Sequence, residues 1–115
     1  MQMLLWVDDT RLPPSSEWTW VKTVDAAKEI LKTVDESLKN EIVIVDLDYD
    51  AGTFALGGGG GYIQILHWIE AKGIDITANN YYFRIHADTD HIGKQLMEQI
   101  IKYHNWNYIP YHNYV

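Results

Sequence analysis

The sequence predicts a three-layer α/β domain built on a parallel sheet. Strand-like runs alternate with amphipathic helical patterns along the chain, which favours parallel pairing with right-handed crossovers. The runs at 3–7 and 42–45 are continuously apolar, as in strands buried on both faces. With 115 residues, the chain has room for one core. We therefore expect a single domain over residues 1–115, with helices on both faces of the sheet.

The N-terminal part begins this alternation. Residues 3–7 (MLLWV) predict a buried strand, and residues 18–23 (WTWVKT) predict an edge strand because they are rich in aromatic and β-branched side chains. A Pro-Pro turn separates the two. Residues 25–34 then keep helical apolar spacing, and Asp25 is the expected N-cap of that helix.

The rest of the chain repeats the pattern. A central strand at 42–45, a helix at 62–72, a strand at 81–85 and a last helix at 92–101 are expected. The tail from Trp106 onward is rich in aromatic residues. It adds an edge strand, lies along the sheet or makes a homodimer, and the sequence leaves these outcomes open.

Acidic side chains gather where three of the strand-like runs end, and seven of them account for the whole net charge of -7. In a parallel sheet of order 2-1-3-4-5, the ligand crevice lies between the carboxyl ends of strands one and three. Clustered carboxylates there predict a Mg²⁺ or Mn²⁺ site. The alternative is that each acid is a turn residue or a helix cap. The seven are Asp8, Asp9, Asp46, Asp48, Asp50, Asp88 and Asp90, and the expected metal ligands are Asp8, Asp9, Asp46 and Asp48.

Several groups near the same edge suit phosphate chemistry. His86 ends a strand, where it acts as a general acid or base or merely satisfies a backbone group. Arg11 either pairs with the acids or binds a phosphate. The glycine run 57–61 precedes a helix, so its amides either hold an anion or form a flexible tip. The residues expected to bind phosphate are Arg11, Gly59, Gly60, Gly61, Thr89 and Lys94, of which Lys94 is equally a plain surface residue.

Composition excludes several classes of protein. The chain has no cysteine, which removes disulfides, thiolate metal sites and cysteine nucleophiles. No apolar run approaches a membrane span and no secretory signal is visible, so we expect a cytoplasmic protein without membrane contact. The acidic balance argues against an extended nucleic-acid surface. The expected partner is a phosphorylated small molecule or nucleotide.

Five segments together resemble one known family, the cyclic-phosphate processing receiver-like domains. The resemblance spans residues 4 to about 101. It implies a receiver-like, flavodoxin-like sheet of order 2-1-3-4(-5) and a role in handling cyclic or terminal phosphates of nucleotides or RNA. This chain lacks the lysine that phosphoacceptor receivers carry at the end of strand five. The segments are LLWVDDTRLPP, WTWVKT, VDLDYD, GYIQILHWIE and IHADTDHIGKQL.

Two functions follow as expectations. In the first, the acid cluster binds a divalent metal and binds, or also hydrolyses, a phosphorylated or cyclic-phosphate nucleotide or RNA end. Asp46 and His86 are then the catalytic residues, with His86 moving a proton. In the second, the domain is a non-catalytic receiver-like module that regulates a partner or sequesters a ligand.

Overall fold

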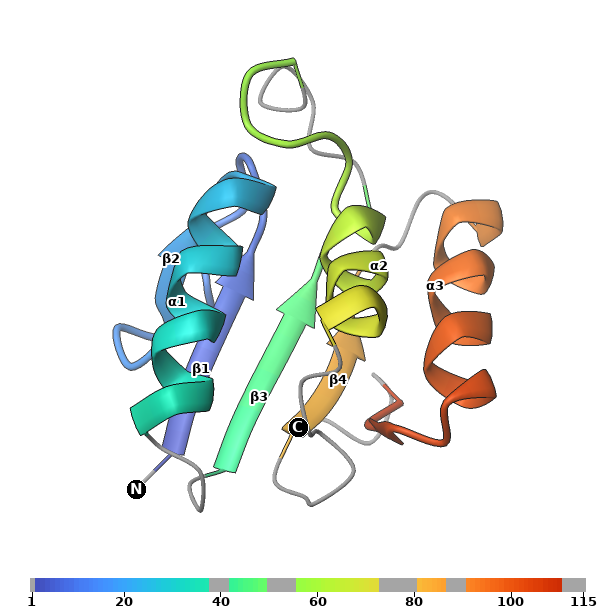
Figure 1. Cartoon of the computed structure of the whole chain (residues 1–115). Coiled ribbons are helices and arrows are strands. Elements are labelled where there is room, and N and C mark those ends of the chain that lie inside the picture. Colours follow the sequence, from blue (N-terminus) through green and yellow to red (C-terminus); the bar gives the residue numbers. More distant parts are fainter. Residues whose placement is uncertain (1, 38–41, 50–55, 73–80, 87–90, 111–115) are drawn as a thin grey trace.

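Five parallel strands form one open sheet in the order β2-β1-β3-β4-β5, as the sequence predicts (Figure 1). The computed structural model describes residues 2–37, 42–49, 56–72, 81–86 and 91–110. The elements are β1 (Gln2–Val7), β2 (Thr19–Val21), α1 (Val24–Ser37), β3 (Ile42–Leu47), α2 (Ile63–Lys72), β4 (Tyr81–Ile85), α3 (His91–Tyr103) and β5 (Asn107–Tyr108).

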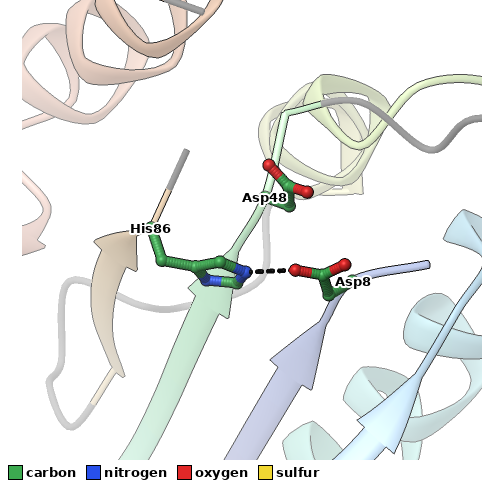
Figure 2. A group of neighbouring side chains, drawn as sticks. All are labelled: Asp8, Asp48 and His86. Atoms are coloured by element: carbon green, nitrogen blue, oxygen red, sulfur yellow. Dashed lines mark hydrogen bonds and ion pairs between the residues drawn. The ribbon is translucent and has the colours of Figure 1, made fainter. Parts of the chain in front are cut away.

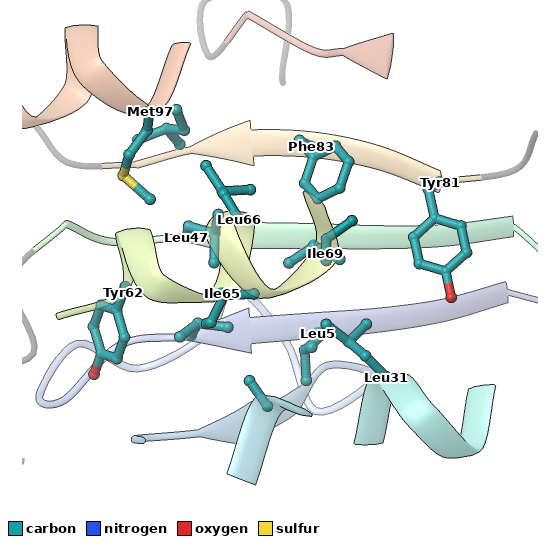
Figure 3. Close-up of a cluster of buried hydrophobic side chains, with 14 of the residues drawn as sticks. Leu5, Leu31, Leu47, Tyr62, Ile65, Leu66, Ile69, Tyr81, Phe83 and Met97 are labelled. Atoms are coloured by element: carbon teal, nitrogen blue, oxygen red, sulfur yellow. The ribbon is translucent and has the colours of Figure 1, made fainter. Parts of the chain in front are cut away.

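The described helices lie on one face of the sheet, which corrects the prediction of helices on both. Leu5, Leu47 and Phe83 project from three strands into the core that all three helices share (Figure 3). The physical reason is the strand order. Each helix joins a strand to one further along the same direction across the sheet, and right-handed crossovers in one direction place their helices on one side.

The opposite face is covered differently. The connection from β1 to β2 runs the other way across the sheet, and its residues form no helix. Trp18, near the end of that connection, lies with its ring 5.7 Å from the Trp6 ring and 5.2 Å from the Arg84 guanidinium carbon. A loop thus takes the place of a covering helix on this face. Its aromatic side chain covers polar side chains of the sheet, which are buried.

Residues at the helix start differ from the expected cap. The Thr23 hydroxyl oxygen accepts a hydrogen bond from the Ala26 amide at 3.0 Å, so Thr23 rather than Asp25 caps α1. Asp25 lies one residue inside the helix, where its charge favours the positive end of the helix dipole. Its amide donates to the Gly58 carbonyl at 2.9 Å, which ties the glycine run to this helix.

The tail contributes the edge strand β5, one of the outcomes left open by the sequence. The Tyr108 hydroxyl donates to Glu98 Oε2 at 2.6 Å and so links β5 to α3. Burial, together with that carboxylate, raises the pKa of Tyr108 well above its ordinary range. Within the described ranges, none of the helices has the length and apolar character needed to cross a membrane.

Candidate functional site

The carboxyl ends of β1, β3 and β4 come together in register. The Asp48 amide donates to the Val7 carbonyl and the His86 amide donates to the Leu47 carbonyl, both at 2.9 Å. These bonds extend the parallel ladder by one residue on each strand. Asp8, Asp48 and His86, which follow the three strands, therefore converge at one edge of the sheet (Figure 2).

His86 is a buried ring held from three sides. Its Nε2 lies 2.8 Å from Asp8 Oδ2, and its Nδ1 lies 2.6 Å from Asp46 Oδ1. The ring stacks on Trp6 with 3.8 Å between centroids and 4° between planes. Both carboxylates accept from the ring only when both nitrogens carry a proton. The geometry thus fixes the orientation of the imidazole at the strand end.

Asp46 lies below this ring as the partner of a buried arginine. Arg84 Nε donates to Asp46 Oδ2 at 2.5 Å and its Nη2 pairs with the same oxygen, while Asp46 Oδ1 faces His86. Asp46 is fully buried and Arg84 is 2% exposed. Both oxygens of Asp46 are therefore engaged by cationic or ring nitrogens, and its predicted roles as metal ligand and catalytic residue stay predictions.

Asp8 is built to stay ionised. Its Oδ1 accepts from the backbone amides of Thr10 and Arg11, each at 2.9 Å. Burial acts to raise the pKa of Asp8, but these two amides and the His86 ring outweigh it and hold the pKa below its ordinary value. A charged carboxylate is the form that binds a metal ion.

Asp48 has the opposite electrostatic environment. Burial and the nearby charge of Asp8 raise its pKa, against the opposing effect of the Tyr49 amide, which donates to Asp48 Oδ1 at 2.8 Å. If His86 donates from both nitrogens, it and Arg84 balance Asp8 and Asp46. Arg11 is the remaining positive group that acts on Asp48, and its charge lowers the pKa of Asp48 without cancelling the effect of burial.

A metal ion fits this donor set. Asp8, Asp48 and His86 each offer one ligand atom, and the three atoms lie within 4.8 Å of one another. Two carboxylate oxygens suit Mg²⁺ and Mn²⁺, and the His86 nitrogen would join them as a ligand only when it carries no proton. The sequence predicted Asp8 and Asp48 as ligands, whereas it assigned His86 to proton transfer.

The other predicted residues take different positions. Asp9 is half-buried and does not belong to the group of three. Arg11 is exposed, and its Nη1 donates to the His86 carbonyl at 3.2 Å, so it stands at the rim. Lys94 is a half-buried residue of α3. Asp50, Asp88, Thr89 and Asp90 lie outside the described residues.

The glycine run has a structural reason of its own. Gly59 and Gly60 adopt positive φ angles of 103° and 98°, a conformation that favours glycine. A Cβ on Gly59 would meet Asp25 Oδ1 at 2.6 Å. The described part of the run therefore packs on the start of α1, and binding of phosphate by Gly59, Gly60 and Gly61 stays a prediction.

Sequence reasoning missed Arg84 and Trp6. Arg84 stands inside the otherwise apolar and aromatic strand YYFRI, and an arginine in a buried strand signals a carboxylate partner. Its register partner is Asp46, and the partner of Asp46 on the other side is Trp6. Once the strand order is known, both residues are expected beside the acid.

Comparison with known proteins adds one finding. The sequence model of the family described as "cyclic-phosphate processing receiver domain" matches residues 3–103. No curated protein and no solved structure matches the chain.

Proposed function

The chain belongs to the cyclic-phosphate processing receiver domain family, and from this premise we propose that it binds Mn²⁺ or Mg²⁺ at Asp8 and Asp48. With the cation bound, this strand-end site would bind a nucleotide or RNA end that carries a cyclic or terminal phosphate. Hydrolysis of a cyclic phosphate is the reaction that the neighbouring groups suit best.

One observation carries this proposal. The carboxylate of Asp48 lies beside that of Asp8, and burial together with the Asp8 charge raises its pKa. Such a pair is unfavourable without a compensating cation. A divalent ion held by Asp8 and Asp48 would supply the compensating charge.

His86 is the proton-transfer group in this proposal. Asp46 holds the Nδ1 atom at 2.6 Å and so orients the ring, while the Trp6 stack prevents it from tilting. The Nε2 atom faces the strand ends and is the one that gives or takes a proton. Arg84 balances the charge of Asp46 from below. Asp46 thereby acts through His86.

Arg11 is the residue best placed to bind the phosphate itself. One guanidinium nitrogen is fixed on the His86 carbonyl and the side chain is exposed at the rim. A guanidinium oriented in this way at an exposed rim directs its positive charge toward an incoming anion. A bound divalent ion supplies Lewis-acid polarisation of the phosphoryl group and a water of lowered pKa.

A second candidate function is binding without chemistry. Both His86 nitrogens face carboxylates. A ring engaged at both nitrogens is less available for proton transfer, which favours a module that sequesters its ligand. The buried Arg84 pair also disfavours phosphorylation of Asp46, since a phosphoryl group there must displace the guanidinium.

Calorimetric titration of Mn²⁺ tests the proposal. Wild type and Glu29→Gln, a matched acid-to-amide change on exposed α1 surface, are expected to bind alike, whereas Asp48→Asn is expected to lose binding. Turnover of cyclic mononucleotides with Mn²⁺ present is then compared in wild type and His86→Gln. Binding with no turnover supports the sequestering module. Equal Mn²⁺ binding by Asp48→Asn and wild type contradicts the metal site.

A further inference from the structure

Tyr49 connects the candidate metal ligand Asp48 to two helices. Its amide donates to Asp48 Oδ1 at 2.8 Å, and its carbonyl accepts from the Tyr62 amide, just before α2, at 3.4 Å. Its half-buried ring packs against the hydrophobic core. The backbone of Tyr49 therefore sets the direction of the Asp48 carboxylate.

The Tyr49 ring rests on Gly93, a buried glycine near the start of α3. A Cβ on Gly93 would lie 2.5 Å from Tyr49 Cγ and 2.6 Å from both Cδ atoms. Such distances do not occur in real contacts, so an alanine here must displace the ring. Movement of the outer part of the Tyr49 ring cannot relieve the clash, because the clashing ring atoms are those nearest to the Tyr49 Cβ.

The backbone gives no other reason for a glycine at this position. Among the described glycines, the positive φ angles belong to Gly59 and Gly60, and Gly93 is not one of them. In a helix, glycine is less favourable than alanine. The absence of a side chain at Gly93 thus has a steric explanation, which is the close approach of Tyr49.

We propose that Tyr49 is a positioning residue for Asp48 and that Gly93 fixes it in place. This inference rests on the proposed metal site and adds a residue from α3 that the acid cluster itself does not contain. A shifted ring moves the Tyr49 amide, and the Asp48 carboxylate moves with the hydrogen bond that it accepts. Residues that orient a metal ligand in this way change metal affinity by about 10- to 100-fold when altered.

A double-mutant cycle on Mn²⁺ affinity tests the proposal. Gly93→Ala is expected to weaken Mn²⁺ binding by about 10-fold. In a Tyr49→Ala background the clash is gone, so the same Gly93→Ala change is expected to leave the Kd unaltered. Ile101→Val, a buried change later in α3, serves as the control that lowers the melting temperature without changing the Kd.

The outcomes separate this inference from the proposed function. An unchanged Kd in Gly93→Ala, or an equal loss in both backgrounds, overturns the role of Tyr49 even though wild type binds Mn²⁺. If wild type binds no Mn²⁺, the proposed function fails, and hydrogen exchange of the Tyr49 amide in the metal-free protein decides the inference. Faster exchange in Gly93→Ala supports it, and unchanged exchange overturns it. If Gly93→Ala does not fold, Tyr49→Ala replaces it, because this change adds no bulk. Weakened Mn²⁺ binding by Tyr49→Ala, or loss of order at Asp48 in its metal-free form, supports the proposal.

Discussion

Removal of the Arg84 charge is expected to destabilise the protein strongly. Arg84→Met leaves the Asp46 carboxylate fully buried, with His86 as its remaining side-chain partner among the described residues. Loss of one member of a buried ion pair costs about 3–5 kcal/mol. For a chain of 115 residues, with an unfolding entropy of about 2.1 cal/mol/K per residue, this lowers the melting temperature by about 12–20 °C.

Two further variants isolate the cause. In Asp46→Leu/Arg84→Met both charges are absent, so we expect at least half of the lost stability to return, because apolar replacement of a whole buried pair is often close to neutral. Lys32→Met is the matched control. Lys32 pairs with Glu29 at 3.7 Å on the exposed surface, and its removal is expected to cost less than about 1 kcal/mol.

Urea unfolding followed by tryptophan fluorescence measures these differences. The reasoning is refuted if Arg84→Met unfolds within about 1 kcal/mol of the Lys32→Met control. It is also refuted if the double variant is less stable than Arg84→Met by itself. The first result would mean that Arg84 does not compensate the charge of Asp46 in solution, and the second that Asp46 stabilises the fold without Arg84.

Three other predictions follow from the electrostatics of the site. Because the raised pKa of Asp48 means that its ionised form is disfavoured by folding, Asp48→Asn is expected to raise the melting temperature at pH 7 without metal, as scanning calorimetry would show. The pKa of Asp8 is lowered, so the Asp8 carboxylate contributes stability above about pH 5, and this contribution is lost as the pH falls below about 4. The prediction is contradicted if the stability of Asp8→Asn falls in an acid titration as that of wild type does. Mn²⁺ at 100 times its Kd is expected to add about 2.7 kcal/mol of stability to wild type, and an equal gain in Asp48→Asn would place the ion elsewhere.

The parallel sheet was predictable because its strands carry strong local signals. The runs MLLWV and IVIV read as buried strands without any tertiary information, and the acids that follow them mark the strand ends. The strand order then places Asp8 beside Asp48, since adjacent parallel strands end at the same edge. This part of the site follows from topology.

The one-sided helical layer was missed although the chain contains the reason. Among the connections between the described strands, the one from β1 to β2 is the one that would place a helix on the other face, and it is short and contains Pro13 and Pro14. Two adjacent prolines there leave too little chain for a helix. The direction of each crossover, taken with this connection, gives the observed arrangement.

The partners of the buried polar groups were not predictable from local patterns. Asp46, a predicted ligand, is engaged by Arg84, which lies opposite it on β4, and by His86, which directly follows β4. Whether a strand-end acid points to the rim or into the sheet depends on the alternation of side chains along β3. Asp46 is still within that strand, whereas Asp48 follows it.

Anomalous diffraction from crystals soaked with Mn²⁺ tests the central claim most directly. We expect one strong peak at the carboxyl ends of β1 and β3, within coordination distance of an oxygen of Asp8 and an oxygen of Asp48, with Asp46 still paired to Arg84. A peak bound to Asp46 with Arg84 displaced, or no peak near these carboxylates, would contradict the account.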